Sequence, residues 1–297
     1  MASTHLRATR ATRAFSLEAF PFTGLVGVAM LALVVITVAV ARVLPGADSG
    51  VDALPVSGPL PQVPVAAYVV VDGLTGEELA SLAADTPQPV GSLVKLMTAH
   101  VVLEDGPLSD PAVVPALALT DGESQAGLQR GDRLTRRELL QAMLVASAND
   151  AADTLARDVA GSERAFVRRM NADAGSLDLT GTAYANAEGL DAPGQHSTAR
   201  DVAVLARDLM GDPAFRDIVR MTATRIDGHR LPATNDLLGG YPGADGIKTG
   251  HTDEAGWCLA ASATRDGRRV IVVVLGAPSE QARDASAAAL LDWAFGR

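Results

Sequence analysis

Apolar runs of strand length lie near the start and near the end of the chain. The run Ala66–Asp72 reads AAYVVVD and precedes a Gly-x-x-Gly segment, which predicts a strand, a turn and a short return strand. Further on, Gly256–Thr264 and Arg269–Gly276 flank the tetrapeptide RDGR, a pattern typical of an antiparallel hairpin. We expect these first and last segments to meet in one sheet.

Helical patterns dominate the region between the predicted strands. Thr135 and Glu138 form a T-x-x-E capping box before an apolar run, which predicts a helix start. An apolar helical stretch is expected from Ser92 to about Leu103, whereas the Pro- and Gly-containing segment Leu108–Arg133 is expected to be irregular. The expected architecture is an α/β fold of the α+β type, an antiparallel sheet of N- and C-terminal strands flanked by helices. Further helices are predicted over residues 149–159, 162–174, 198–209 and 279–295.

The first 64 residues have a different pattern. Arginines mark the beginning, and no charged residue occurs from Ala19 to Ala41, a length close to that of a membrane span. The positive-inside rule places the N-terminus in the cytoplasm and the remainder outside the cell. We predict a cytoplasmic basic tail over 1–19, a transmembrane signal-anchor over 20–41, a Pro-rich linker over 42–64 and an extracytoplasmic domain over 65–297. The A-x-A pattern ending at Ala41 leaves open cleavage there and secretion.

Composition excludes several classes of function. The net charge is −10, so nucleic acid is not an expected partner, because phosphate binding needs clustered Lys and Arg. The single cysteine, Cys258, lies in the apolar run WCLA and is expected to be a buried strand residue rather than a catalytic thiol. No histidine pair has metal-ligand spacing, so we expect no metal and no cofactor.

Lysine is rare in this chain. Of the 25 Lys and Arg residues, two are lysines, Lys95 and Lys248. Arginine replaces lysine well at exposed positions, but a partly buried lysine can lose its proton and arginine effectively cannot. The two lysines are therefore candidates for sites that need a titratable amine, unless an Arg-rich composition has left them by chance.

The first lysine belongs to the tetrapeptide Ser92-Leu93-Val94-Lys95. Positions i and i+3 share a helix face, so the Ser92 hydroxyl and the Lys95 amine can meet. A serine hydroxyl needs a neighbouring base before it attacks, and a desolvated lysine near another cation can be that base. The S-x-x-K pattern is weak alone, because it occurs by chance in many proteins.

A second polar group, Ser147-Ala148-Asn149, is expected at the junction of two helices. There Ser147 can relay a proton and the Asn149 amide can bind a peptide carbonyl. Simple helix capping by either residue is the alternative explanation.

The second lysine belongs to Lys248-Thr249-Gly250-His251, which is expected on a strand just before the hairpin. A cation and a hydroxyl suit a substrate carboxylate, and Gly250 is expected to leave room for a substrate backbone. A polar edge strand would also explain these residues. However, S-x-x-K, S-x-N and K-T-G occur in the order typical of penicillin-binding proteins and class A β-lactamases, and together they use both lysines.

The chain resembles the low-molecular-mass penicillin-binding proteins of the D-alanyl-D-alanine carboxypeptidase family, over roughly Ala66 to Phe295. It departs from the family where Gly91 and Val94 replace the common Ala and Thr, and where Glu188 replaces a common His. The resemblance is carried by GSLVKLMTA at 91–99, SANDAA at 147–152, Phe166 with Met170-Asn171, EGLD at 188–191, STARD at 197–201, and DGIKTGHT at 245–252 followed by Ala255-Gly256.

The resemblance implies a β-lactamase/transpeptidase-like fold and a serine-type D-Ala-D-Ala carboxypeptidase, with 65–297 as its catalytic domain. Its substrates would be peptidoglycan pentapeptide stems ending in D-Ala-D-Ala, and β-lactam antibiotics would be covalent inhibitors. By family analogy, Ser92 forms the acyl-enzyme, Lys95 is the base, Ser147 relays a proton and Asn149 holds the substrate. Lys248 and Thr249 would bind the terminal carboxylate, and the backbone N–H groups of Ser92 and His251 would form the oxyanion hole. With Gly250, the residues Lys248, Thr249 and His251 are the expected substrate-binding positions.

Other functions use similar residues. A class A β-lactamase needs a Glu-x-x-Leu-Asn loop, which the sequence between Asn149 and Lys248 does not contain. A non-catalytic β-lactam sensor or wall-binding module is a second alternative. D,D-endopeptidase and transpeptidase activities would use the same residues.

Overall fold

The computed structural model describes residues 58–117 and 122–296. The predicted basic tail, the signal-anchor and linker residues 42–57 lie outside the described residues. The described remainder of the predicted linker, 58–64, forms neither helix nor strand. Within the described part of the chain, no helix has both the length and the apolar character needed to cross a bilayer.

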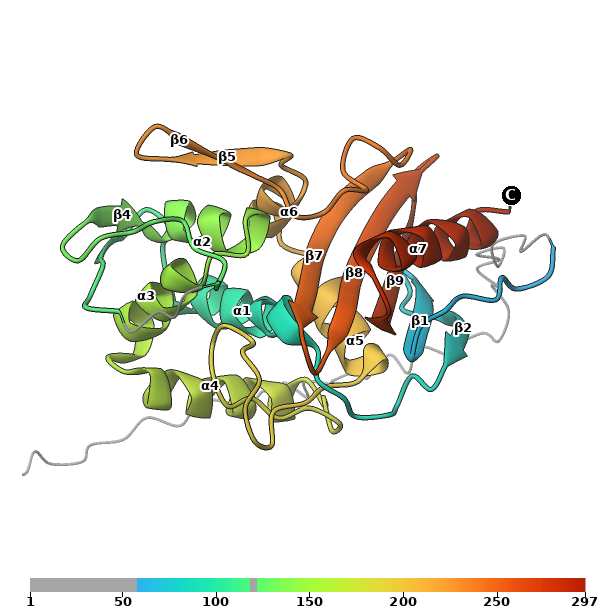
Figure 1. Ribbon diagram of the computed structural model, residues 1–297, viewed down its shortest axis with the longest axis horizontal. Coiled ribbons are helices and arrows are strands. Elements are labelled where there is room, and N and C mark those ends of the chain that lie inside the picture. The colour runs from blue at the N-terminus through green and yellow to red at the C-terminus, as the bar shows by residue number, and fades with distance from the viewer. Residues whose placement is uncertain (1–57, 118–121, 297) are drawn as a thin grey trace, which may run out of the picture. The chain divides into compact units, whose positions relative to one another are not determined.

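A five-stranded antiparallel sheet with the order β2-β1-β9-β8-β7 forms the centre of the described domain (Figure 1). The expected meeting of the first and last segments is confirmed, because β1 pairs with β9 and places Val69 opposite Val273. The strands are β1 (Ala67–Asp72), β2 (Glu78–Leu82), β7 (Ala244–Thr252), β8 (Gly256–Arg265) and β9 (Arg268–Ala277).

Both faces of the sheet are buried, because alternate residues of its central strands enter two different cores. Val69 and Val273 belong to the larger core, whereas Val70 and Val272 belong to the smaller one. Each fully buried valine contributes about 1.5–3 kcal/mol of transfer free energy relative to exposure. The strands that carry the site are therefore held by apolar packing on two sides.

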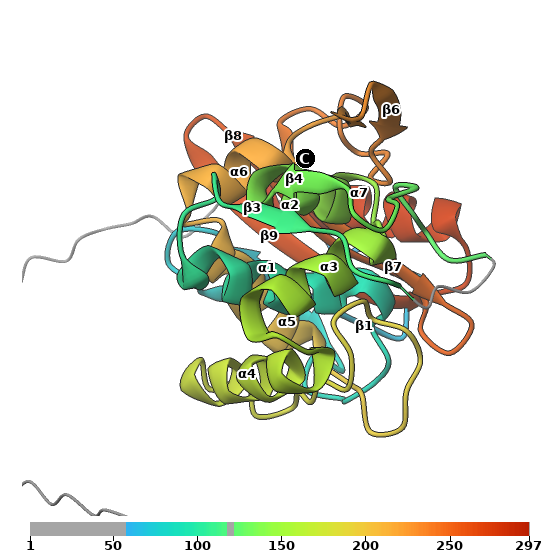
Figure 2. The ribbon, with the colours of Figure 1, turned by 90° about the vertical axis from the view of Figure 1, so that its left-hand side faces the viewer.

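Helices cover the two faces of the sheet. In Figure 1, α7 lies in front of β8 and β9, and α5 lies behind β9 and β1; Figure 2 shows α1 to α4 grouped together. The capping box predicted at Thr135 is present, since its side chain accepts from the Glu138 N–H and Glu138 accepts from the Thr135 N–H. The α-helices are α1 (Lys95–Asp105), α2 (Arg136–Val145), α3 (Asn149–Ala160), α4 (Glu163–Ser176), α5 (Ala199–Leu209), α6 (Pro213–Val219) and α7 (Glu280–Ala294).

The expectation of an irregular segment over Leu108–Arg133 is wrong at both of its ends. There β3 (Pro111–Val113) pairs with β4 (Arg133–Thr135). Each strand has three residues, too few to show an alternating pattern in the sequence, and the pairing partner lies about twenty positions away along the chain.

Helix α6 and a hairpin of β5 (Ala223–Ile226) with β6 (His229–Pro232) were not predicted. Both have local signals in the sequence. The Asp212 side chain caps α6 ahead of a proline at its first turn. The Asp-Gly pair between β5 and β6 has positive φ angles of 45° and 79°, the conformation that a two-residue hairpin turn favours.

Candidate active site

Ser92 and Lys95 lie at the start of the helical stretch expected from Ser92. That stretch begins as a 3-10 turn, η1 (Gly91–Val94), and continues as α1. Three residues per turn place positions i and i+3 above one another. The Lys95 Nζ is hydrogen-bonded to the Ser92 Oγ at 2.8 Å. Lys95 is fully buried, whereas Ser92 is half-buried and lines a cleft.

Lys95 is held by two further acceptors. Its Nζ donates to the Asn149 Oδ1 at 2.7 Å and to the Glu188 backbone oxygen at 2.5 Å. Burial lowers the pKa of Lys95 to about 7, although the carboxylates of Glu188, Glu123 and Asp150 act in the opposite direction. A substantial fraction of Lys95 is therefore a neutral amine near neutral pH, as a general base requires.

The second lysine is paired with the second serine. Ser147 lies in the short connection between α2 and α3 with a φ of 63°, and Lys248 projects from β7. The Lys248 Nζ donates to the Ser147 Oγ and to the Thr249 backbone oxygen, both at 2.9 Å. Burial, followed by the cations Lys95 and Arg283, lowers the pKa of Lys248 well below its ordinary value.

Thr249 and His251 are two positions apart on β7, and both line the cleft that Ser92 also lines. The Thr249 Oγ1 is 2.6 Å from the Thr234 Oγ1, so two hydroxyls lie together on the cleft wall. The His251 ring is exposed and stacks on Trp257, with 4.1 Å between the ring centroids. The His251 side chain is thus part of an aromatic pair at the cleft.

Gly250 has a packing role that was not expected from the sequence. A Cβ at this position would lie 2.5 Å from the Val90 backbone oxygen, so the space beside Gly250 is filled by the chain that leads into η1. Gly250 also lines the cleft, and the expectation that it leaves room for a substrate backbone there stays a prediction. A Cβ at Gly189 would lie 2.2 Å from the Gly91 oxygen, and one at Gly91 would lie 2.9 Å from the His251 nitrogen.

Most of the predicted site residues line one cleft of about 500 Å³. The cleft is bordered by Ser92, Ser147, Asn149, Thr249, Gly250 and His251, which come from three different segments of the chain. Lys95 and Lys248 are buried and reach it through their hydrogen bonds to Ser92 and Ser147. The fold thus brings together all eight residues that the sequence singled out.

Three further residues of the cleft were missed by sequence reasoning. Arg283 of α7 is buried, forms ion pairs with Glu280 at 3.3 Å and Asp284 at 2.7 Å, and lies over the Trp257 ring. Glu123 and Thr234 come from loops with no recognisable motif. Arg283 lies on a predicted helix, but its burial depends on how that helix packs and is not marked in the sequence.

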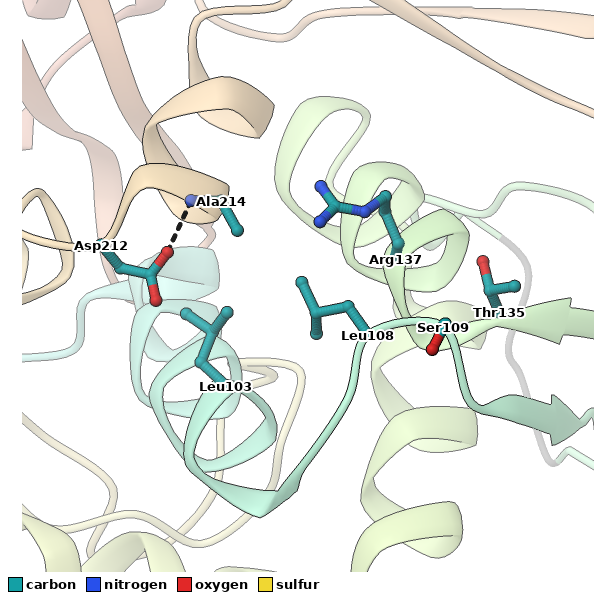
Figure 3. A pocket seen from close by; sticks show the side chains of 7 residues that line it. All are labelled: Leu103, Leu108, Ser109, Thr135, Arg137, Asp212 and Ala214. Carbon is teal, nitrogen blue, oxygen red and sulfur yellow. Dashed lines mark hydrogen bonds between the residues drawn. The ribbon is translucent and has the colours of Figure 1, made fainter.

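A second hollow, of about 580 Å³, lies away from this chemistry, between α1, α2 and the start of α6 (Figure 3). Its main polar groups already have structural tasks: Asp212 accepts from the Ala214 N–H at 2.6 Å, and Thr135 caps α2. No nucleophile is paired with a base among its lining residues. We therefore place the reactive site at the Ser92 cleft.

The geometry of the Ser92 cleft defines a class of protein. A serine oxygen within hydrogen-bonding distance of a buried amine of lowered pKa is an activated nucleophile. A second serine–lysine pair can pass a proton to a leaving group. Arg283, and Lys248 when it is protonated, suit a carboxylate. The fold and the site are those of the serine–lysine class of proteins, in which a buried amine lies beside a serine hydroxyl.

The chain belongs to the peptidase S11 family, the D-alanyl-D-alanine carboxypeptidases, whose sequence profile matches residues 55–279. It is 35% identical to the D-alanyl-D-alanine carboxypeptidase DacF of Bacillus subtilis over 240 residues, which are 76% of this chain and 61% of DacF. The chain therefore spans less than two thirds of the length of that relative.

Solved structures of penicillin-binding proteins share the fold. Penicillin-binding protein 6B from Escherichia coli superposes with a TM-score of 0.76 and 36% identity, covering 81% of this chain and 80% of that one. Penicillin-binding protein D2 from Listeria monocytogenes, in its ampicillin-bound form, superposes with a TM-score of 0.72 and 33% identity, covering 80% of this chain and 100% of that one. The expected α+β penicillin-binding fold is confirmed.

Proposed function

We propose that this chain is a serine-type D-Ala-D-Ala carboxypeptidase that acts on the stem peptides of peptidoglycan and is acylated by penicillin. The observation that carries the proposal is the 2.8 Å contact between the Ser92 Oγ and a buried Lys95 Nζ whose pKa is lowered to about 7. Membership of the carboxypeptidase family and the ampicillin-bound form of a similar structure support it.

Acylation begins when neutral Lys95 takes the Ser92 proton and the Ser92 Oγ attacks the carbonyl carbon of the penultimate D-Ala. The oxyanion that forms is bound by the backbone N–H groups of Ser92 and His251. The close approach of η1 to β7 supports this pairing, since a Cβ on Gly91 would lie 2.9 Å from the His251 nitrogen. Each such donor typically lowers the barrier by about 2.7–4 kcal/mol.

The tetrahedral intermediate then loses the terminal D-Ala. The leaving amine receives the proton that Lys95 took from Ser92, passed on through the Ser147 hydroxyl, which Lys248 contacts at 2.9 Å, and Lys95 is neutral again. Lys248, Thr249 and the nearby Arg283 bind the terminal carboxylate, while Asn149 holds the peptide. Water activated by Lys95 then cleaves the Ser92 ester and regenerates the enzyme.

The test uses the purified full-length chain and a peptide that ends in D-Ala-D-Ala. We expect release of free D-alanine, and we expect a penicillin adduct on Ser92 by mass spectrometry of proteolytic fragments. The Ser92→Ala variant is the control, and its thermal unfolding should match that of the wild type. Absence of D-alanine release by a folded wild-type chain would contradict the proposal.

The same experiment separates the alternatives. A β-lactamase would release hydrolysed penicillin rapidly, whereas we expect the adduct to persist. A β-lactam sensor or wall-binding module would form the adduct and release no D-alanine. A transpeptidase would pass the acyl group to an added amine, which a labelled D-amino acid acceptor would reveal.

We further propose that the basic residues 1–19 and the charge-free segment 20–41 anchor the chain in the cell membrane, with the catalytic domain outside the cytoplasm. The substrate supports this location, because peptidoglycan lies outside the membrane. The test treats intact cells that express the chain with external protease and then isolates their membranes. We expect the chain in the membrane fraction, with its catalytic domain digested. Recovery of a soluble form that begins after Ala41 would instead indicate cleavage and secretion.

A further inference from the structure

The Asn149 amide is held in one orientation by two neighbours of opposite character. Asn149 opens α3 and is 4% exposed. Its Oδ1 accepts from the Lys95 Nζ at 2.7 Å, and its Nδ2 donates to the Glu123 Oε2 at 2.9 Å. A carboxylate can only accept and an ammonium can only donate. Rotation of the amide by half a turn would therefore place the Asn149 Oδ1 against the Glu123 carboxylate, where both are acceptors. It would also place the Asn149 Nδ2 against the Lys95 amine, where both are donors when Lys95 is protonated.

We propose that Glu123 is a positioning residue for acylation: its carboxylate keeps the Asn149 Oδ1 facing Lys95, and so keeps the Lys95 amine directed at Ser92. The hydrogen-bonded series runs from Glu123 through Asn149 and Lys95 to Ser92, with contacts of 2.9, 2.7 and 2.8 Å. This inference rests on the proposed function, and it adds to that function a residue outside the three sequence motifs.

The loop that carries Glu123 is fixed to α3 by contacts that do not involve the Glu123 side chain. The Asn149 N–H donates to the Ser124 backbone oxygen at 2.7 Å. The buried Asp150 carboxylate accepts N–H groups from the consecutive residues Ala126, Gly127 and Leu128 at 2.9 to 3.0 Å. Replacement of the Glu123 side chain should therefore leave the loop in place.

Glu123 acts on Lys95 through charge as well as through orientation. The charged groups around Lys95 are the carboxylates of Glu188, Glu123 and Asp150 and the amine of Lys248. The three carboxylates each raise the pKa of Lys95 against the effect of burial. Removing the charge of Glu123 lowers that pKa, so Lys95 stays neutral to a lower pH and the acid limb of the acylation profile moves to lower pH.

The two effects can be separated with two substitutions at one position. Glu123→Gln removes the charge but keeps an oxygen that can accept from the Asn149 Nδ2, whereas Glu123→Ala removes both. Asp253→Asn is a matched control, because Asp253 is an exposed carboxylate of the same cleft that forms no hydrogen bond to Asn149. It removes the same charge without touching the series.

The measurement is the rate of acylation of the full-length chain by fluorescent penicillin, taken from mildly acidic to mildly alkaline pH. At its optimum, Glu123→Ala should be slower by about tenfold or more, the usual effect of losing a hydrogen bond to a charged group. Glu123→Gln should retain most of the rate. Both variants should show the acid limb at lower pH, and Asp253→Asn should match the wild type in rate and profile.

Two results would overturn the inference. One is a Glu123→Ala variant with wild-type rate and an unmoved acid limb; the other is an Asp253→Asn variant as impaired as Glu123→Ala. If Glu123→Ala does not fold, Glu123→Gln provides the test. An acid limb of its acylation profile at the same pH as in the wild type would also overturn the inference. Failure of the wild type to be acylated at all would instead contradict the proposed function.

Discussion

The two sides of the cleft each bury a lysine against a serine, but they surround it with opposite charge. On the helical side, Lys95 meets the carboxylates of Glu188, Glu123 and Asp150. On the sheet side, Lys248 meets the cations Lys95 and Arg283. Burial lowers the pKa of both amines; the carboxylates then raise that of Lys95, whereas the cations lower that of Lys248 further.

This difference assigns different tasks to two chemically identical side chains. Lys95 is poised with a pKa of about 7, which allows it to take and return a proton during one catalytic cycle. Lys248 lacks anionic neighbours that would hold its proton, so a substrate carboxylate arriving beside it would raise its pKa and be bound by the resulting cation. The comparison leads to four predictions.

Lys95→Arg should have the largest effect. Arginine keeps the positive charge but cannot act as a base, so acylation by fluorescent penicillin should fall by about 10²–10⁴-fold, the usual contribution of general-base catalysis. The exposed Arg220→Lys exchange is the matched control and should label normally. Labelling of Lys95→Arg at the wild-type rate would refute the base role.

Lys248→Met should alter recognition of the substrate terminus. The thioether side chain fills similar space without a charge, so the preference for a peptide with a free terminal carboxylate over its amide should fall by about 10–100-fold. The measurement is the ratio of kcat/KM for the two peptides, which a partial loss of folded protein does not change. An unchanged ratio would show that Lys248 does not bind the terminal carboxylate.

Acylation should depend on pH through Lys95. Since its amine must be neutral to accept the Ser92 proton, the rate should be constant above about pH 7 and should fall about tenfold per pH unit well below it. The apparent pKa belongs jointly to Lys95 and the nearby Glu188. Stopped-flow acylation by penicillin in buffers of constant ionic strength measures it, and a flat profile down to mildly acidic pH would contradict this prediction.

Glu188→Gln should have the smallest effect. Burial and the neighbouring Glu163 raise the pKa of the Glu188 carboxyl to about 7, and its ionised form raises the pKa of Lys95. The variant should therefore acylate with its acid limb shifted to lower pH and its rate at alkaline pH little changed. Glu104→Gln, an exposed change on the helix that Lys95 opens, should leave the limb in place. A shift of the acid limb of Glu188→Gln to higher pH would contradict the conclusion that ionised Glu188 raises the pKa of Lys95.

The sequence predicted the parts of the fold that have long, regular patterns. The continuous apolar run of β1, the RDGR turn between β8 and β9, and the capping box at Thr135 each specify their element through neighbouring residues. The three-residue strands β3 and β4 were missed because their pairing is long-range. The β5–β6 hairpin was missed although its Asp227-Gly228 turn was readable.

For the site, the sequence supplied the motifs but not the surroundings that adjust them. The scarcity of lysine pointed directly to Lys95 and Lys248. Glu123, Thr234 and Arg283 reach the cleft only because the fold brings distant segments together, so no local spacing marks them. Gly250 differs from these three residues because it belongs to a motif. Its close packing against the Val90 oxygen is nevertheless visible only in the structure.

The contacts of Gly91, Gly189 and Gly250 have a consequence for the proposed acylation. Because backbone meets backbone there with no space for a methyl group, the alignment of the attacking oxygen is set by main-chain packing rather than by the reactive side chains themselves. A slight displacement of η1 would therefore slow the proposed acylation while leaving every chemical group intact. Inspection of the three motifs alone would not detect such a change.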